Sequence, residues 1–142
     1  MNEHYKLDEM DRIILSELIN DARKPYLEIA RECGVSGAAI HQRVKRLEEA
    51  GIIYGSSTLI KPSSLGYTIC AFMFLNLTEN NKYREVINAL EDVHEIVECH
   101  FITGRSSILI KLYCRVNAHL MDVVLNTIQK IPYVQQTETQ IS

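Results

Sequence analysis

The chain has 142 residues and a net charge of −3, with 46% hydrophobic and 23% charged residues. That length admits one ordinary domain or two small ones, and the apolar fraction is typical of a soluble globular protein. No apolar run approaches about 18 residues, which excludes a membrane-spanning helix, and the N-terminus lacks the pattern of a secretory signal. The four cysteines form no Cys-x-x-Cys pair, so we expect reduced thiols in a cytoplasmic protein.

The first predicted element is an amphipathic helix over residues 8–22, capped by Asp8. Its expected core stripe consists of Met10, Ile13, Ile14, Leu18 and Ile19. Asp11 on this helix is expected to pair with Arg43 or Arg46. As an exposed pair it would contribute little.

Residues 26–51 predict two helices separated by a tight break. Gly34 stands where the first helix must stop and the chain must turn, and Ser36 is a ready N-cap for the second. The first helix has an apolar stripe made of Leu27, Ile29 and Ala30, and Pro25 leads into it. In the second helix Ile40, Val44 and Leu47 recur at i, i+4 and i+7, so they share one buried face.

The other face of that second helix carries cations and no acids, which is typical of a DNA-recognition helix. Small residues at its start would allow close approach to a major groove, and longer polar side chains would reach bases or phosphates. The candidate DNA-binding residues are Ser36, Ala38, Ala39, His41, Gln42, Arg43, Lys45 and Arg46. The alternative is a solvated surface helix that packs a three-helix core.

Charge alone does not make this half of the chain a strong DNA binder. Residues 1–61 hold nine Lys and Arg against ten Asp and Glu. Binding must therefore rest on a local patch, and one copy would bind weakly because phosphate contacts dominate affinity. We expect a dimer or a larger assembly to add half-sites together.

After the helices, residues 52–54 and 57–60 predict two short strands around Gly55 and Ser56, in the manner of a small wing. Residues 1–60 are therefore predicted as a winged helix-turn-helix domain. The Pro, Ser and Gly residues of segment 61–66 predict a linker, and residues 67–142 a second domain.

The second domain reads as β-α-β-β-α-β, the ferredoxin-like arrangement, so the chain is of the α+β class. The predicted elements are residues 67–77, 81–91, 95–102, 107–116, 118–131 and 133–141. Tyr83, Val86, Ile87 and Leu90 are expected to face inward on the first helix. Leu120, Val124, Leu125, Ile128 and Ile131 are expected to do so on the second.

Both faces of the predicted sheet are apolar. Residues at alternate positions of segment 69–77 point to one side. The other side carries Phe72, Phe74, Leu109 and Tyr113. A monomer would not leave such a patch in water, so a second copy of the same sheet is the simplest cover and predicts an isologous homodimer. The alternative is a lone sandwich with a smaller patch.

This organisation resembles one family, the leucine-responsive regulator/AsnC (Lrp/AsnC) or feast/famine regulators, over nearly the whole chain. The residues that carry the resemblance are Leu7-Asp8-Glu9-Met10-Asp11, Arg43-Val44-Lys45-Arg46-Leu47-Glu48-Glu49-Ala50-Gly51-Ile52-Ile53, Leu65-Gly66, Glu98-Cys99-His100, Thr103-Gly104 and Thr137-Glu138-Thr139. Several of these strings together are specific, although each alone is weak.

The resemblance implies a transcriptional regulator that binds double-stranded DNA and is built from dimers, often from four dimers in a ring. It also implies that the second domain binds an amino acid between dimers. The implied effector-binding residues are Thr103, Gly104, Arg105, Ser106, Ser107, Thr137, Glu138 and Thr139. Backbone amides near Gly104 could bind the ligand carboxylate, and Glu138 its ammonium group. A plain hairpin turn is the alternative for segment 103–107.

One departure bears on the ligand. Many members carry an acid in a Gly-Asp-Tyr-Asp pattern, whereas this chain has Gly104-Arg105-Ser106-Ser107, which weakens the case for leucine or lysine. The asparagine-responsive branch is similar to this chain at Ser107, Ile110-Lys111, Cys114-Arg115 and Ile40-His41. The resemblance therefore favours asparagine, or another polar amino acid such as glutamine.

No catalytic residue, metal site or cofactor is predicted. The chain has no phosphate-binding glycine loop, its five histidines form no HExxH pair, and the adjacent Cys99 and His100 would point to opposite faces of a strand. Two other readings stay open. One is a DNA-compacting architectural protein without a ligand, and the other is a small-molecule binding module or an enzyme without a DNA role.

Overall fold

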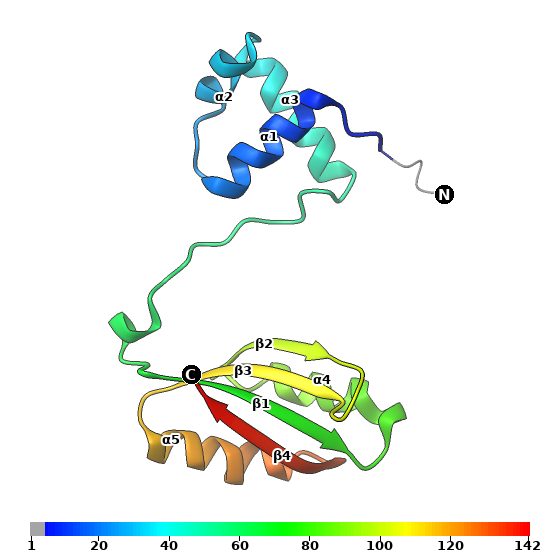
Figure 1. Ribbon diagram of the computed structural model, residues 1–142, viewed down its shortest axis with the longest axis vertical. Coiled ribbons are helices and arrows are strands. Elements are labelled where there is room, and N and C mark those ends of the chain that lie inside the picture. Colours follow the sequence, from blue (N-terminus) through cyan, green and yellow to red (C-terminus); the bar gives the residue numbers. More distant parts are fainter. Residues whose placement is uncertain (1–4) are drawn as a thin grey trace. The chain divides into compact units, whose positions relative to one another are not determined.

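The computed structural model describes residues 5–142, which form two compact units divided between Thr58 and Leu59 (Figure 1). The first unit consists of three helices, α1 (Glu9–Asn20), α2 (Tyr26–Cys33) and α3 (Gly37–Glu49). The second is a four-stranded sheet with two helical segments on one face. None of the helices in residues 5–142 is long and apolar enough to cross a membrane.

The helix-turn-helix forms where the local signals predict it. Gly34 adopts a left-handed conformation with φ 67° and ends α2, and its amide donates to the carbonyl oxygens of Ala30 and Arg31. The Ser36 hydroxyl then accepts from the Ala39 amide at 3.2 Å and starts α3. Ile40, Val44 and Leu47 are buried on α3, as their spacing predicts.

The apolar stripes of the first two helices are narrower than predicted. On α1, Ile14 is fully buried, but Ile13 is 38% and Ile19 is 82% exposed. On α2, Leu27 is 56% exposed. Three short helices bury only the residues that point at the common centre, so apolar residues on the flanks of a stripe stay in contact with water. The sequence periodicity therefore predicts the correct buried side of each helix but includes too many residues in it.

The predicted wing is wrong, because no residue between Gly51 and Lys61 is in a strand. The amides of Ile52 and Ile53 donate instead to the Leu47 carbonyl oxygen, and both side chains pack on the helical core. Beyond them Tyr54 is 97% and Leu59 is 95% exposed. A two-stranded ribbon with no third strand or helix against it is marginal in water. The segment is therefore extended chain.

The segment predicted as a linker, residues 61–66, is largely a 3₁₀ helix over Pro62–Leu65. Proline with its fixed φ begins this helix and Gly66, with φ 83°, ends it. The extended part of the connection lies just before it, at residues 54–61.

The sheet contains β1 (Ile69–Leu77), β2 (Ile96–Phe101), β3 (Ile108–Cys114) and β4 (Val134–Ile141), in the order β2-β3-β1-β4 with every pair antiparallel. Helix α4 (Tyr83–Glu91) lies between β1 and β2 in the chain, and α5 (Asn117–Asp122) follows β3. This is the predicted ferredoxin-like topology. Alternate residues of β1 and β3 form a dry core with both helices.

The second helical segment buries Leu120, Val124 and Ile128 as predicted and differs from its prediction at Leu125. Residues 117–130 run as α5, a π-helical turn over Val123–Thr127 and a 3₁₀ turn over Ile128–Lys130. The π-turn accommodates an extra residue in the turn, so Val123 is buried and Leu125, predicted inward, is 48% exposed. A strict 3.6-residue period does not anticipate this shift.

Candidate nucleic-acid interface and effector surface

The outward face of α3 carries four long polar side chains, which we call the recognition patch: His41, Gln42, Lys45 and Arg46. All four are exposed. Ser36 and Ala38 at the start of α3 are exposed and Ala39 is half-buried, so the small residues leave room at that end of the helix. The patch is therefore placed as a groove-reading surface requires.

Two side chains of the recognition patch have neighbours in the same unit. The His41 ring lies 5.9 Å, centroid to centroid, from the ring of Tyr26 at the start of α2. Lys45 lies 3.9 Å from Glu49 one turn further along, and both are well exposed, so water screens this pair. Arg46 has no side-chain hydrogen bond or ion pair with any other residue between 5 and 142. The patch is thus free to meet an outside partner.

Arg43, also a predicted DNA-binding residue, differs from the four residues of this patch because it is half-buried and paired with α1. Its guanidinium lies 2.6 Å from Asp8 Oδ2 and 2.9 Å from Asp11 Oδ1. These hydrogen bonds, that to Asp8 first, raise the pKa of Arg43. Arg43 directly precedes buried Val44, so its side chain emerges at the border of the core rather than on the outward face.

The predicted effector-binding residues of segment 103–107 lie in the turn between β2 and β3. Gly104 has φ 131°, a conformation that favours glycine. The Ser107 amide donates to the Leu75 carbonyl oxygen, and its hydroxyl donates to Asn80 Oδ1 at 3.0 Å. Thr103, Gly104 and Arg105 are exposed. The turn is therefore tied to the end of β1 while its tip stays open.

The predicted residues on β4 separate onto two faces of the sheet. Thr137 pairs with Leu75 and Thr139 with Met73, so both point to the helix-covered side. Glu138 pairs with Phe74 and points to the other side. Within one chain these three do not form a single ring of polar contacts. Strand alternation, applied to adjacent residues, is the signal that could have separated them from sequence.

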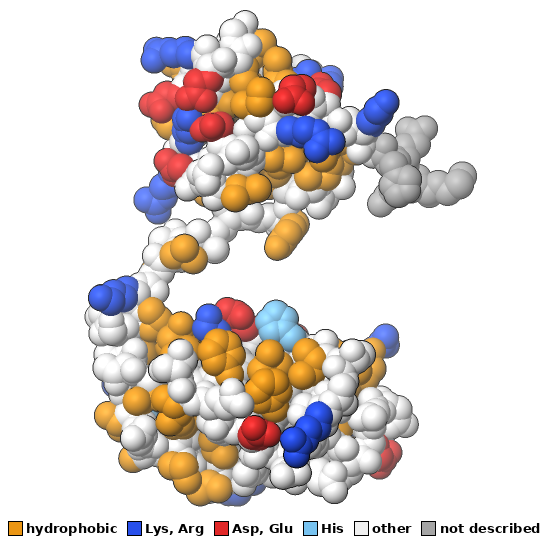
Figure 2. All heavy atoms as spheres, viewed as in Figure 1, with side chains coloured by type: hydrophobic (Ala, Val, Ile, Leu, Met, Phe, Trp, Pro, Cys, Tyr) orange, Lys and Arg blue, Asp and Glu red, His pale blue; other side chains and the backbone are white. Residues whose placement is uncertain are grey.

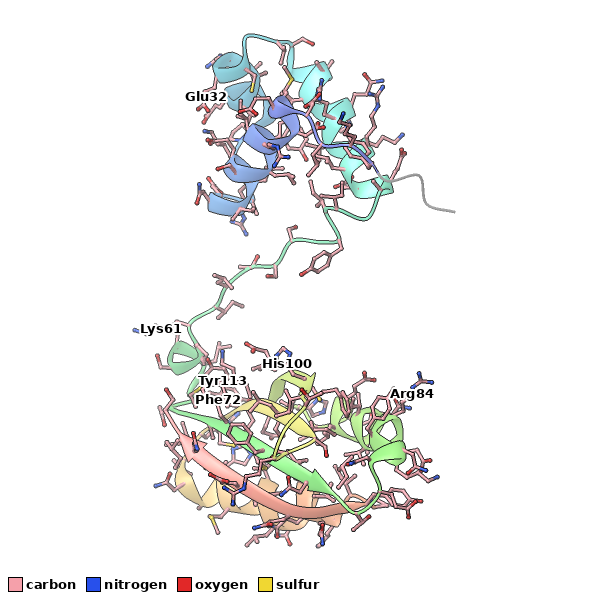
Figure 3. The ribbon with its side chains drawn as sticks, turned by 45° about the vertical axis from the view of Figure 1, so that its right-hand side comes forward. Glu32, Lys61, Phe72, Arg84, His100 and Tyr113 are labelled. Atoms are coloured by element: carbon pink, nitrogen blue, oxygen red, sulfur yellow. The ribbon has the colours of Figure 1, made fainter. Side chains whose placement is uncertain are left out.

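The face of the sheet opposite the helices, which we call the open face, carries aromatic side chains around one cation (Figures 2 and 3). The Lys111 ammonium lies 5.8 Å from the ring centroids of both Phe72 and Tyr113 and 3.0 Å from Glu98 Oε1. The hydrogen bond from Lys111 lowers the pKa of Glu98 and raises that of Lys111. From sequence alone, Glu98 has no feature that sets it apart from other strand carboxylates.

The side chains of the open face are largely apolar, but in a single chain they are partly exposed to water. Phe72, Phe74, Leu109 and Tyr113 are all half-buried, whereas their neighbours on the helix side are fully buried. Figure 2 shows hydrophobic side chains in orange beside blue, red and pale blue groups on the second unit. Cys99 pairs with Ile110 and His100 with Leu109, so the two point to opposite faces as predicted.

Comparisons with known proteins cover both units. An AsnC-type helix-turn-helix domain matches residues 7–48, and an Lrp/AsnC ligand binding domain matches residues 70–142. The Haemophilus influenzae regulatory protein AsnC is 40% identical over 138 residues, covering 97% of this chain and 92% of that protein.

Solved structures agree with these matches. The structure of Escherichia coli AsnC superposes with a TM-score of 0.88 at 39% identity and covers 97% of this chain and 93% of that chain. A feast or famine regulatory protein from M. tuberculosis, complexed with L-methionine, superposes with a TM-score of 0.88 at 29% identity, with coverage of 96% and 92%.

Proposed function

This chain belongs to the Lrp/AsnC family, and on that premise we propose that it reads DNA through the recognition patch and responds to a polar amino acid, asparagine or glutamine. It is a helix-turn-helix transcriptional regulator with a ligand-binding domain, and its relatives are regulators rather than enzymes. The observation that carries the DNA half is the exposure of His41, Gln42, Lys45 and Arg46 together on α3.

The effector proposal rests on the turn at residues 103–107 and on the relatives. An amino acid needs donors for its carboxylate, and the open tip at Gly104 allows a ligand to reach the backbone. Hydroxyls at Ser106, Ser107 and Thr137 add polar contacts, and Arg105 adds a cation. The similarity to AsnC proteins favours asparagine or glutamine, while the M. tuberculosis complex with methionine supports an amino acid as the ligand class.

Because Thr137 and Thr139 share one face of β4 and Glu138 lies on the other, we place the threonines with the turn in the effector site. Glu138 is left to the open face. The remaining contacts of the ligand would come from another copy of the chain. This division is the part of the proposal that mutation can test most directly.

We further propose a homodimer formed through the open face, with dimers assembling further. Phe72, Phe74 and Tyr113 form a half-wet apolar surface that a second copy of the sheet would cover. The net charge of −3 also favours a dimer. Because the chain is not basic overall, one recognition patch would bind DNA weakly, and linking two patches in a dimer raises the affinity.

The experiment that tests this function is a mobility shift with DNA from just upstream of the protein's own gene, with and without each of the twenty amino acids. A shift altered by asparagine or glutamine is the expected result. A shift indifferent to all twenty would favour the architectural alternative. No shift at all would contradict the DNA assignment and make the ligand-binding domain the seat of function.

Arg105→Ala is the matched variant for the effector site, because Arg105 is exposed and its neighbour Gly104 keeps its special backbone conformation. We expect the amino-acid response to weaken while the shift without ligand is unchanged. A substitution at Gly104 is less informative, since its positive φ would strain any other residue. An unchanged response in Arg105→Ala would place the ligand away from this cation.

A further inference from the structure

Asp11 is the one charged side chain that is buried among residues 5–142, with 1% of its surface exposed. It lies in the first turn of α1, in the interior of the helical unit. Its Oδ1 accepts from Arg43 at 2.9 Å, and its Oδ2 accepts from the Tyr5 hydroxyl at 3.2 Å and from the Asp8 amide at 3.1 Å. Both oxygens of this buried carboxylate accept hydrogen bonds, as buried polar groups in folded proteins generally do.

Asp8 extends this arrangement into a cluster, which we call the α1–α3 clamp: Tyr5, Asp8, Asp11 and Arg43. The carboxylate of Asp8 caps α1 by accepting from the Asp11 amide at 2.8 Å and also binds Arg43 at 2.6 Å. The capping bond from the Asp11 amide, followed by the Arg43 hydrogen bond, lowers the pKa of Asp8. The start of α1 is thereby joined to the middle of the recognition helix.

Stability alone gives little reason for such a cluster. Replacing a buried ion pair with apolar side chains of similar volume is often neutral or stabilising, because desolvation offsets the attraction. What the cluster does supply is orientation, since Nη1 of Arg43 donates to both Asp8 and Asp11 and is thereby held between two carboxylates at the start of α1. The clamp therefore limits how α3 can rotate about its own axis.

Rotation of α3 matters for base reading. Side-chain tips lie about 6 Å from a helix axis, so a roll of about 20° would move them by about 2 Å. Such a shift exceeds the tolerance of a hydrogen bond to a base edge. His41 and Gln42 precede Arg43 directly, so both would shift with any roll of α3.

We propose that the clamp is a specificity device, in which Arg43, bound by Asp11 and Asp8, is a positioning residue that sets the rotation of α3 and so the register of the recognition patch. The proposal rests on DNA binding by α3. Arg43 itself touches no phosphate in this arrangement, because two carboxylates already compensate its charge. Its removal should reduce sequence discrimination rather than electrostatic attraction.

The test compares Arg43→Met with Lys45→Ala and Arg46→Ala in the full-length protein. Each is titrated, over a range of salt concentrations, against a duplex selected by the wild type from random-sequence DNA and against a scrambled duplex of equal length. For Arg43→Met we expect the ratio of the two affinities to fall by about 10-fold or more, which is the discrimination that one bidentate hydrogen bond to a base supplies. The salt slope should be unchanged.

The two control variants remove cations that are candidates for binding phosphate, so both affinities should fall in parallel. The slope of log affinity against log salt should decrease by about 0.9 for each phosphate that is no longer neutralised. The same decrease in Arg43→Met would show that Arg43 binds phosphate and would overturn the proposal. An unchanged affinity ratio would overturn it too. Failure of the wild type to select any sequence would instead contradict the DNA assignment.

Asp11→Asn on its own keeps the proposal testable if Arg43→Met folds poorly, because the amide retains the shape of the carboxylate and the affinity ratio should fall in the same way. Where both variants fold, combining them completes a double-mutant cycle. If the two residues act together, the loss of discrimination in the double variant equals that of the stronger single variant. Arg43→Lys, which keeps a charged donor on a more flexible stem, is expected to recover part of the ratio. Additive losses in the cycle would refute a shared role.

Discussion

The two faces of the C-terminal sheet share the same four strands and carry different chemistry. The helix face presents fully buried aliphatic side chains such as Ile110 and Leu112, and it is dry within one chain. The open face presents half-buried Phe72 and Tyr113 around Lys111. Strand alternation thus divides one sheet into a surface that holds the fold and a surface available for assembly.

The largest effect is expected from a cavity on the helix face. Ile110→Ala removes a fully buried side chain from β3 and is expected to lower the free energy of unfolding by about 2–5 kcal/mol, measured by urea denaturation. Leu109→Ala is the matched control at the adjacent position on the open face, and the diluted protein should keep a native circular dichroism spectrum. If Leu109→Ala unfolded the chain and Ile110→Ala did not, the open face rather than the helix face would hold the fold together.

A smaller effect is expected from a charge on the open face. Phe72→Asp removes an aromatic ring from the proposed dimer interface and puts a carboxylate there, on the position that pairs with Lys111. Because the apolar contact is lost and a charge must be desolvated, the dimer should weaken by about 2 kcal/mol or roughly 30-fold. Sedimentation across protein concentrations measures the change. A wild-type chain that sediments as a 16.3 kDa species at micromolar concentration would exclude the dimer.

The smallest effect is a dependence on pH. The Lys111 hydrogen bond holds the pKa of Glu98 below its ordinary value in the folded chain. Glu98 therefore adds stability above the unfolded pKa, and this contribution is lost as pH falls through the folded pKa. The unfolding free energies of wild type and Glu98→Gln should differ near neutral pH and converge as the pH falls below the lowered pKa of Glu98 in the folded chain. A constant difference would mean that ionisation of Glu98 is not involved.

How much could be predicted from sequence depends on how far apart the interacting residues lie. Gly34, Ser36 and Ile40 act through neighbours within one or two turns, and the helix-turn-helix follows from them. The alternation of β1 likewise predicts its buried face. The sequence predicts that Asp11 pairs with Arg43 or Arg46, but these residues lie more than 30 positions from Asp11, and only the packed helices show that the partner is Arg43.

Other differences between the predicted and the observed structure arise where tertiary packing overrides a local sequence pattern. A short two-stranded wing needs a third element, and residues 52–60 have none, so their β-like composition does not become a hairpin. The π-turn at Val123–Thr127 moves Leu125 outward against its periodicity. Whether the effector residues form one site depends on other copies of the chain, which a single sequence does not describe.

The extended segment at residues 54–61 sets a length scale for promoter recognition. It can span at most about 29 Å, somewhat less than the roughly 34 Å of one DNA turn. In a dimer, once one helical unit holds its half-site, the other searches only a volume of this radius, at an effective concentration in the millimolar range. In the proposed dimer, half-sites displaced by a few base pairs would stay within reach, and we expect binding to tolerate such changes in spacing.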